Sequence, residues 1–209
     1  MDNLKTPLLQ GAQALGIHLE PQQAQQLLDY VALLYKWNQA YNLTAVRQPE
    51  AMLVKHILDS LAVVPYIKGD RLLDVGTGPG IPGIVLAIVW PERQFDLLDS
   101  NIKKIRFVRQ AVRTLGLTNV QAVHARVESW QPEACYDSIV SRAFAELALF
   151  VKLTRHLLCK EGCWWAMKAH AEAEQALLPN GIQVVDTYEL TVPGLSARRT
   201  LVVLKQEQA

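Results

Sequence analysis

Hydrophobic residues change their spacing about one third of the way along this chain. Up to about residue 68 they recur every three to four positions, which predicts helices with one apolar face. The first stripe follows Pro21, a residue that suits a helix start, and comprises Leu27, Val31, Leu34 and Tyr41. A second stripe, within residues 49–67, comprises Leu53, Ile57, Leu61 and Val64. We therefore expect a helical N-terminal cap over residues 1–68.

From Arg71 onward, short apolar runs alternate with helical stretches. We predict strands at RLLDV, QFDLLD, VQAVHA, YDSIVSR, CWWAMK, IQVVDTYEL and TLVVLK. Helices are predicted from about Pro82, from Asn101 to Leu115, from Glu146 to Leu158 and near Ala171. Such alternation produces a mostly parallel sheet covered on both faces. The last two runs are joined by TVPGLSARR without a helix, which fits an antiparallel end. We expect a doubly wound α/β, Rossmann-like domain over residues 69–209 with a mostly parallel seven-stranded sheet.

Composition narrows the class of protein without identifying a partner. Half of the 209 residues are hydrophobic, which is enough for a sizeable core, and the formal net charge is only +1. The longest apolar run, residues 84–90, is too short to cross a bilayer, and the first residues do not resemble a signal peptide. We expect a cytoplasmic protein without membrane association, and a monomer.

The three cysteines, Cys135, Cys159 and Cys163, show no C-x-x-C spacing. An odd count with this spacing predicts neither a disulfide framework nor a zinc site. We expect free thiols in a reducing cytosol, and no metal.

A glycine-rich turn, DVGTGPGIPG, follows the first predicted strand. Glycine permits tight turns and close approach to a ligand, and ligands of parallel sheets bind at the carboxyl ends of strands. Residues 78–83 match G-x-G-x-x-G, and Asp99 follows about 20 residues later, as in dinucleotide-binding proteins. The register argues against a dinucleotide, because the strand ends at Gly76 and Asp74 would lie near an anionic pyrophosphate.

A ligand with a cationic end fits the same residues better. Asp74 would complement an ammonium or sulfonium group, and Asp99 would bind ribose hydroxyls. The turn glycines Gly76, Gly78 and Gly80 would admit an amino-acid portion. S-adenosylmethionine combines these features. We favour it over a nicotinamide cofactor and over a ligand-free turn in which Asp74 is satisfied internally.

Two further strand ends supply candidate residues. After the third strand, the Val127 amide and the Glu128 carboxylate would lie near the adenine, although a solvated loop charge is an equal interpretation of Glu128. The fourth strand ends in SRAFA, where Arg142 would face the transferable methyl group or pair with a nearby carboxylate. The chain has no Asn-Pro-Pro-Tyr or Asp-Pro-Pro-Tyr quartet and no Pro-Cys pair, which disfavours methylation of an exocyclic amine or of pyrimidine carbon 5.

Basic residues concentrate between positions 100 and 127, where there is no Asp or Glu. They are Lys103, Lys104, Arg106, Arg109, Arg113 and Arg126. Arg106, Arg109 and Arg113 share one helical face, which can follow a phosphate backbone or be an ordinary solvated surface. A second basic cluster comprises Arg198, Arg199 and Lys205.

Six stretches together closely resemble the RsmG (GidB) family over essentially the whole chain. They are KWNQAYNLTAVR, HILDSL, LLDVGTGPGIPGIVLAI, FDLLDSNIKKIRFV, RVES and SRAFAEL, in this order. The resemblance implies a class I S-adenosylmethionine-dependent methyltransferase with a helical N-terminal extension. It implies that the substrate is ring nitrogen 7 of a guanine in bacterial 16S ribosomal RNA, at position 527 in the 530 loop. The partner is then this RNA or the small ribosomal subunit.

The resemblance also implies roles for individual residues. Its cofactor site corresponds to Gly76, Ile81, Val127, Glu128 and Arg142, and supports Asp74, Gly78, Gly80 and Asp99. Its RNA-binding residues correspond to Lys103, Lys104, Arg199 and Lys205, to which we add Arg106, Arg109 and Lys168. Lys168 stands in Met-Lys-Ala where the family often has Leu-Lys-Gly, and Arg198 replaces a residue that is acidic in some relatives. In the first stretch, Trp37, Asn38, Tyr41 and Asn42 would serve helix packing and capping, or closure of the pocket.

Ring nitrogen 7 of guanine carries an in-plane lone pair and no proton, so its attack on a sulfonium methyl group needs no general base. We therefore expect catalysis by positioning, with the guanine presented unpaired. Arg142 would orient the cofactor, or contact guanine oxygen 6 or a phosphate. Two alternatives remain, a methyltransferase with a small-molecule substrate and an RNA-binding module that binds the cofactor without turnover.

Overall fold

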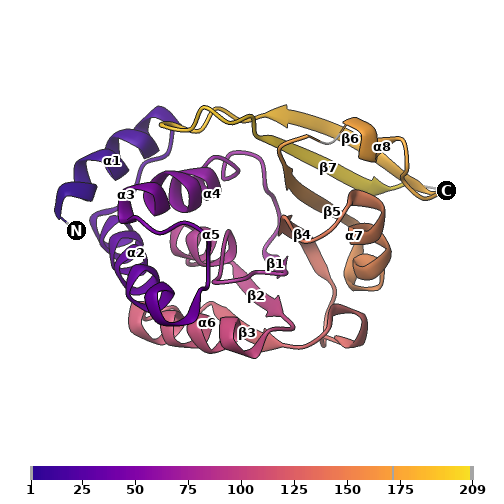
Figure 1. Ribbon diagram of the computed structural model, residues 1–209. Coiled ribbons are helices and arrows are strands. Elements are labelled where there is room, and N and C mark those ends of the chain that lie inside the picture. The colour runs from indigo at the N-terminus through magenta and orange to yellow at the C-terminus, as the bar shows by residue number, and fades with distance from the viewer. Residues whose placement is uncertain (1, 171, 208–209) are drawn as a thin grey trace.

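The computed structural model describes residues 2–170 and 172–207, and a seven-stranded sheet forms its centre (Figure 1). The strands are β1 (Arg71–Val75), β2 (Gln94–Asp99), β3 (Val120–His124), β4 (Tyr136–Arg142), β5 (Leu158–Lys168), β6 (Ile182–Glu189) and β7 (Thr200–Gln206). Their order is β3-β2-β1-β4-β5-β7-β6. The pairings from β3 to β5 are parallel, whereas β7 pairs antiparallel with both β5 and β6. The predicted mostly parallel sheet with an antiparallel end is confirmed.

The strand order reverses beside β1, because the chain proceeds outward through β2 and β3 and then returns to place β4 on the other side. In open α/β sheets such a reversal leaves a crevice at the carboxyl ends of the strands. The glycine turn after β1 and the SRAFA stretch at the end of β4 therefore meet at this edge.

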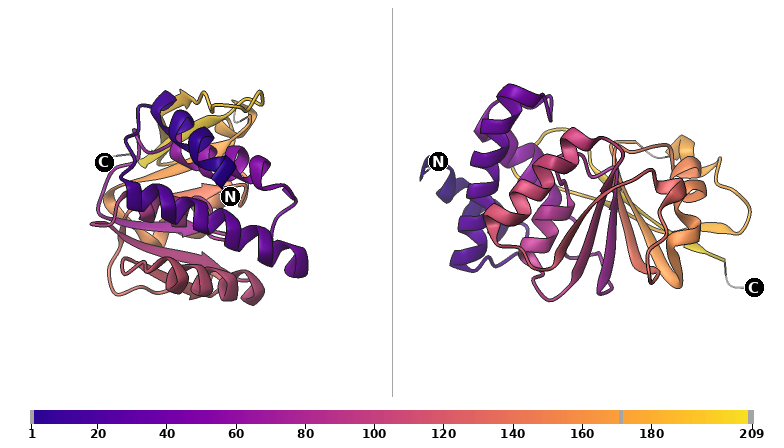
Figure 2. Two further views of the ribbon diagram at one scale, coloured as in Figure 1. Left: turned by 90° about the vertical axis from the view of Figure 1, so that its left-hand side faces the viewer. Right: turned by 90° about the horizontal axis from the view of Figure 1, so that it is seen from below.

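Helices cover the sheet and one end of the molecule (Figure 2). They are α1 (Lys5–Ala14), α2 (Pro21–Tyr41), α3 (Pro49–Met52), α4 (Asp59–Leu61), α5 (Gly83–Val89), α6 (Ile102–Leu115), α7 (Leu147–Thr154) and α8 (Glu172–Gln175). Short 3₁₀ turns occupy Asp2–Leu4, Val127–Ser129 and Arg155–Leu157. Leu27 and Leu34 of α2 share one buried cluster with Ile84 of α5 and Phe107 of α6. The N-terminal helices thus pack against the sheet domain as a cap.

Three sequence predictions need correction. Residues 49–61 form one helical run, but Leu53–Leu58 is a π-helical turn that the apolar spacing did not indicate. The helix predicted to end at Leu158 ends at Thr154, because the chain turns there and Leu158 begins the buried strand β5. Tyr41 belongs to the predicted apolar stripe, but it is 52% exposed. It is the last residue of α2 and lies past the part of the helix that packs against the rest of the protein. Ala171 lies outside the described residues.

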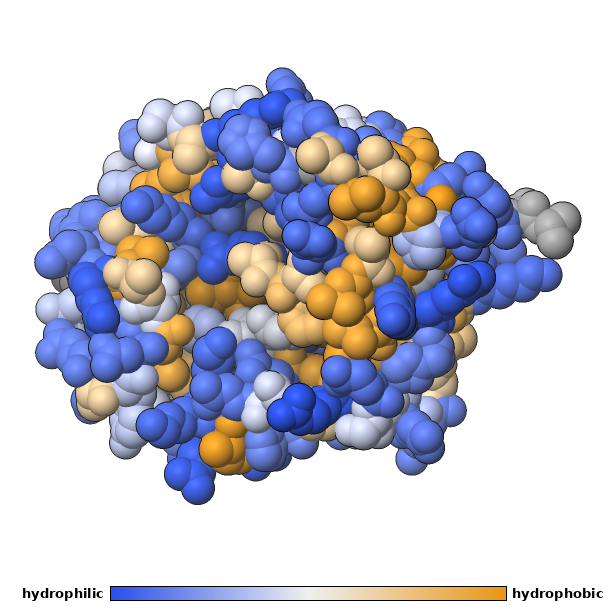
Figure 3. All heavy atoms as spheres, turned by 45° about the vertical axis from the view of Figure 1, so that its right-hand side comes forward, coloured by the Kyte–Doolittle hydropathy of each residue, from blue (hydrophilic) through white to orange (hydrophobic). Residues whose placement is uncertain are grey.

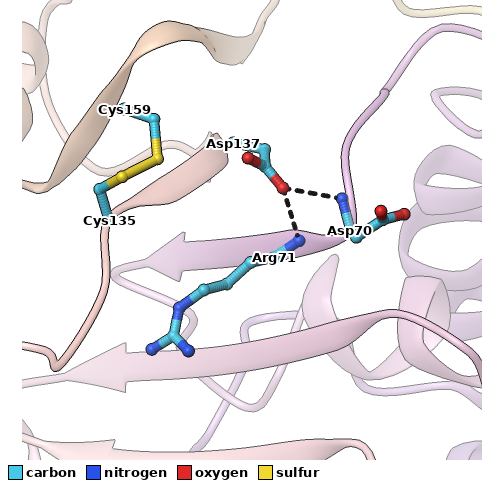
Figure 4. Close-up of a disulfide and its surroundings, with 5 residues drawn as sticks. All are labelled: Asp70, Arg71, Cys135, Asp137 and Cys159. Atoms are coloured by element: carbon cyan, nitrogen blue, oxygen red, sulfur yellow. Dashed lines mark hydrogen bonds between the residues drawn. A yellow bond between two sulfur atoms is a disulfide. The ribbon is translucent and has the colours of Figure 1, made fainter.

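The cysteine prediction is wrong as well, because Cys135 and Cys159 form a disulfide (Figure 4). The cause is strand pairing, since Tyr136 of β4 lies opposite Leu158 of β5 and each has a cysteine as its chain neighbour. Nearby, the Asp137 carboxylate accepts hydrogen bonds from the backbone amides of Asp70 and Arg71, at 2.9 and 3.0 Å. The disulfide and this contact fasten the amino-terminal edge of the sheet, opposite the glycine turn.

Candidate functional site

The turn after β1 has a backbone conformation that only glycine adopts readily. Gly76, Gly78 and Gly80 have positive φ angles of 68°, 61° and 96°. A Cβ on Gly76 would lie 2.6 Å from Phe144 Cδ2, so this position has no room for a side chain. A Cβ on Gly78 would meet nothing closer than the Gly76 carbonyl oxygen at 3.9 Å. The turn therefore leaves open space directly beside its backbone at Gly78.

Asp74 holds this turn from behind. It is fully buried, and its Oδ2 accepts hydrogen bonds from the Thr77 hydroxyl at 2.6 Å and the Gly83 amide at 2.8 Å. Its Oδ1 is buried without a hydrogen-bond partner. Burial raises the pKa of Asp74 to about 6, although the bonds from Thr77 and Gly83 lower it. Oδ2 is thus satisfied within the protein. Contact of Oδ1 with a cationic ligand stays a prediction.

Asp99, the last residue of β2, holds the turn from the side of the adjacent cavity. Its Oδ2 accepts the Gly78 amide at 3.0 Å, and its Oδ1 accepts the Asn101 amide at 2.8 Å. Lys104 Nζ lies 3.7 Å from Oδ2. Asp99 also lines the adjacent cavity, although its side chain is only 8% exposed, so it anchors the turn at the cavity wall.

A cavity of about 430 Å³ opens where β1, β2, β3 and β4 end. It is lined by Gly76, Leu98, Asp99, Ser100, Lys104, Ala125, Arg126, Val127, Glu128, Ala143, Phe144, Ala145, Leu149 and Leu153. Figure 3 shows this face of the molecule hollowed, with hydrophobic side chains gathered beside the hollow. Of the predicted cofactor residues, Gly76, Asp99, Val127 and Glu128 come together here. Gly78, Gly80 and Ile81 belong to the turn behind it, and Phe144 is a lining residue that the sequence reasoning missed.

Arg142 does not line this cavity but pairs with a carboxylate, as one sequence interpretation expected. Its Nη1 donates to Asp59 Oδ2 at 3.1 Å and to the Lys55 carbonyl at 2.8 Å. Arg199 Nε donates to the other Asp59 oxygen at 2.9 Å. Asp59 is fully buried and was not among the residues predicted from the sequence, although it lies in the HILDSL stretch. Arg199, predicted to bind RNA, is thus engaged within the protein.

His56 lies beside this pair on the π-helical turn. Its Nε2 is 3.0 Å from the Thr44 hydroxyl, and its Nδ1 is 3.0 Å from the Lys55 carbonyl and 3.3 Å from Arg142 Nη2. Burial, followed by the charge of Arg142, lowers the pKa of His56 to about 4. His56 is therefore neutral near pH 7 and contributes packing and hydrogen bonds between the cap and β4.

The predicted RNA-binding residues divide into two groups. Lys103, Arg106 and Arg109 are exposed on α6, which begins at the rim of the cavity. Lys104 turns toward Asp99 instead. Lys168 Nζ donates to the Ala145 carbonyl at 2.6 Å and to Glu174 Oε2 at 2.8 Å, and Lys205 is half-buried. A role of these residues in RNA binding stays a prediction.

The KWNQAYNLT stretch shows the packing and capping roles that its sequence allowed. The Asn38 side chain accepts from the Thr44 amide at 2.8 Å and donates to the Val46 carbonyl at 3.0 Å. Asn42 ends α2 in the left-handed conformation, and the Trp37 ring packs edge-on against Phe107. Closure of a pocket by these residues stays a prediction. One contact was not foreseen, the hydrogen bond of 2.8 Å from the Tyr30 hydroxyl to the Pro79 carbonyl in the glycine turn.

Among residues 2–170 and 172–207, no group of three or more His, Cys, Asp or Glu side chains is placed to hold a metal ion. None of the helices in those ranges has the length and hydropathy that a membrane crossing requires.

Comparison with known proteins identifies relatives over nearly the whole chain. Residues 23–202 match the GidB family model, described as rRNA small subunit methyltransferase G. A protein of Hydrogenovibrio crunogenus named Ribosomal RNA small subunit methyltransferase G is 54% identical over 198 residues, which cover 94% of this chain and 92% of that protein. The protein of the same name from Pseudomonas syringae is 49% identical over 212 residues and covers 99% of both chains.

Solved structures share the fold at much lower identity. A SAM-dependent methyltransferase from Aquifex aeolicus has a TM-score of 0.59 at 18% identity, covering 74% of this chain and 92% of that one. Coclaurine N-methyltransferase, solved with N-methylheliamine and SAH, has a TM-score of 0.58 at 13% identity, covering 91% of this chain and 73% of that one. The predicted class of fold is confirmed.

Proposed function

This chain belongs to the rRNA small subunit methyltransferase G (GidB) family, and from that premise we propose that it methylates ring nitrogen 7 of a guanine in 16S ribosomal RNA, at position 527 in the 530 loop. The methyl donor is S-adenosyl-L-methionine. The proposal rests on one observation, a nucleoside-sized cavity at the strand-order reversal, bounded by the glycine turn and Asp99, inside the region that matches the family.

The residues around the cavity fit this cofactor. Gly78 leaves open space beside its backbone, so a ligand can approach the turn closely. The Asp99 carboxylate at the cavity wall would accept hydrogen bonds from ribose hydroxyls, and the Val127 amide and Glu128 would flank the adenine. Because the strand order is β3-β2-β1-β4, a cofactor held by these residues would lie with its nucleoside over β2 and β3 and its reactive end over β1 and β4.

When bound, S-adenosylmethionine supplies an electrophilic methyl group on a sulfonium centre. The chain's own residues hold the geometry. The Gly78 amide and Asp99 fix the turn, Tyr30 ties it to α2, and Asp59 holds Arg142 at the end of β4. Preorganisation of this kind lowers the barrier by aligning the reacting atoms before the reaction.

Attack by guanine nitrogen 7 requires no general base. This atom carries no proton, so no side chain has to remove one. Asp99 is occupied by two backbone amides, and His56 is already neutral and engaged with Thr44. Positioning therefore accounts for the chemistry that the proposal requires.

The basic face of α6 supports an RNA substrate. Lys103, Arg106 and Arg109 are exposed on a helix whose first turn adjoins the cavity rim. Positive side chains of this kind attract and orient phosphates. A strand bound along α6 would pass beside the opening over β1 and β4.

The direct test is methyl transfer from labelled S-adenosylmethionine to small ribosomal subunits from cells that lack this protein. We expect transfer to these subunits, and little transfer to subunits from cells that contain it. Borohydride and aniline treatment, which cleaves RNA at 7-methylguanine, should map the label to the 530 loop. Absence of label, or label at another base or atom, would contradict the proposal.

A further inference from the structure

The loop that follows β4 is held in a strained conformation. Ala143 has a φ of 59°, which is uncommon for a residue with a side chain and costs about 1 kcal/mol. Arg142, its neighbour, is fixed by Asp59 and by the Lys55 carbonyl. Strain of this sort persists only where surrounding contacts maintain it, and it concentrates at functional sites.

A second ionic contact fixes the other end of the loop. Lys168 Nζ donates to the Ala145 carbonyl at 2.6 Å and pairs with Glu174 at 2.8 Å. Glu174 also accepts the amide of Leu147, the first residue of α7, at 2.8 Å. Two partly buried ion pairs, one at each end, thus determine where the intervening residue lies.

That residue is Phe144, and its ring faces the cavity. The ring occupies the space that a side chain at Gly76 would need, which places it over the end of β1. Phe150 meets it edge-on, with ring centroids 6.3 Å apart. Phe144 is half-buried, so one part of its surface is packed and another part remains available to a ligand.

We propose that Phe144 is the platform on which the target guanine stacks, and that Lys168 and Asp59 are positioning residues for it. This inference rests on the proposed function. Methylation at nitrogen 7 moves one positive charge onto the purine, because the nitrogen lone pair forms the new bond while the electrons of the broken carbon–sulfur bond stay with sulfur. An aromatic face attracts a cation, so the ring binds the transition state more tightly than the neutral guanine.

The sulfonium is the other cation that could lie on this ring. Its charge disappears during the reaction, so contact with Phe144 would stabilise the starting state and slow the transfer. The location of Phe144 over the β1 and β4 ends, beyond the predicted nucleoside position, also favours the incoming base. The two arrangements differ in a measurable way, because only a ring on the sulfonium would favour S-adenosylmethionine over the uncharged S-adenosylhomocysteine.

The test compares Phe144→Leu, which keeps an apolar side chain of similar size, with Phe144→Tyr, which keeps the ring. Each variant is assayed for kcat and KM on unmethylated small subunits, and for Kd of both cofactor forms by calorimetry. We expect Phe144→Leu to lower kcat about tenfold, with both Kd values within about twofold of the wild-type protein, and Phe144→Tyr to restore most of kcat. Unchanged Kd values also show that the variant is folded.

Three outcomes would overturn this assignment. They are an unchanged kcat in Phe144→Leu, an equal loss in Phe144→Tyr, and a selective loss of affinity for S-adenosylmethionine, which would place the ring on the cofactor. No transfer by the wild-type protein would overturn the proposed function together with this inference, whereas the first three results leave the proposed function standing.

Substitution of Lys168 gives an independent test, with Lys152 as the control residue of equal charge. Lys168→Met and Lys152→Met each remove one positive charge, Lys152 from α7 and Lys168 from the end of β5, but only Lys168 holds the Ala145 carbonyl. We expect Lys168→Met to lower kcat several-fold at unchanged cofactor Kd, and Lys152→Met to leave kcat within about twofold. If Lys168→Met instead raised KM and weakened its salt dependence at unchanged kcat, Lys168 would be an RNA contact and not a positioning residue.

Discussion

Arg142 donates a hydrogen bond to Asp59 at 3.1 Å across the boundary between the N-terminal cap and the sheet. The second Asp59 oxygen accepts from Arg199 at 2.9 Å, so one carboxylate joins the cap, the end of β4 and the segment before β7. Asp59 is fully buried, while the two arginine side chains retain 24% exposure. This single carboxylate offsets one of the two positive charges that Arg142 and Arg199 bring to the end of the sheet where the proposed reaction creates a cationic base.

We expect Asp59→Asn to lower the free energy of unfolding by about 2–3 kcal/mol, because it leaves two partly buried guanidinium groups without a counter-charge. Urea unfolding measures the loss. Glu92→Gln is the matched control, since Glu92 is a 65% exposed partner of Arg93 at 3.8 Å and should contribute less than about 0.5 kcal/mol. Equal, small losses in both variants would show that Asp59 has no such role.

Asp74 should make stability depend on pH in a particular direction. Its pKa is about 6 in the folded protein against 3.8 for an ordinary aspartate, so between these values the folded state keeps a proton that the unfolded chain has lost. Stability therefore falls as pH rises from about 4 to about 6, by at most about 1.4 kcal/mol per pH unit, and the loss is constant above that range. Asp74→Asn cannot titrate there. Urea unfolding of both proteins should show a difference that changes with pH, and a constant difference would contradict the assignment.

Comparing Gly78→Ala with Gly116→Ala should separate the effect of a side chain on ligand binding from its effect on backbone strain. Both Gly78 and Gly116 have positive φ, 61° and 66°, and a Cβ on either finds free space in the protein. Each alanine substitution should cost about 1 kcal/mol of stability. Only Gly78→Ala should weaken S-adenosylmethionine binding, by about tenfold or more, since its methyl group occupies the space beside the turn. Calorimetry would contradict this role of Gly78 if both variants bound the cofactor equally well.

The basic face of α6 should control the salt dependence of activity on ribosomal particles. We expect Arg106→Ala combined with Arg109→Ala to raise KM several-fold and to reduce the slope of log(kcat/KM) against log salt by about two, one for each charge removed. Lys160→Ala is the control, because Lys160 is exposed near the start of β5, at the opposite edge of the sheet. The same slope in wild-type and double-variant proteins would exclude this face from substrate binding.

The disulfide should stabilise the protein without affecting catalysis. Cys135 and Cys159 are 24 residues apart in sequence, and a cross-link over such a loop contributes about 3 kcal/mol. We expect a loss of this size in the Cys135→Ala, Cys159→Ala double variant, and a similar loss when the wild-type protein is reduced. Activity at 25 °C should stay within about twofold, because the bond lies at the edge opposite the cavity. If reduction left the stability of the wild-type protein unchanged, the expected stabilisation by the disulfide would be contradicted.

Local patterns were sufficient to predict the strands of the sheet and the glycine turn after β1. The alternation from Arg71 predicted all seven strands, and the run from Asn101 to Leu115 matched α6 with its capping Asn101. The glycine turn was recognisable because positive φ angles and close backbone approach demand glycine wherever they occur. The π-helical turn at Leu53–Leu58 left no comparable trace, since its apolar spacing is compatible with an ordinary helix.

The partners of the charged residues depend on contacts between distant segments. Asp59 and Arg199 are 140 residues apart, and Arg142 is 83 residues from Asp59, so no periodicity connects them. Lys168, predicted to bind RNA, also holds the Phe144 loop through the Ala145 carbonyl, and Cys135 meets Cys159 because Tyr136 of β4 lies opposite Leu158 of β5. The spacing of side chains along the sequence indicates whether a segment is a helix or a strand and which of its faces is buried. Which of several possible partners a charged residue or a cysteine contacts depends on how distant segments pack together.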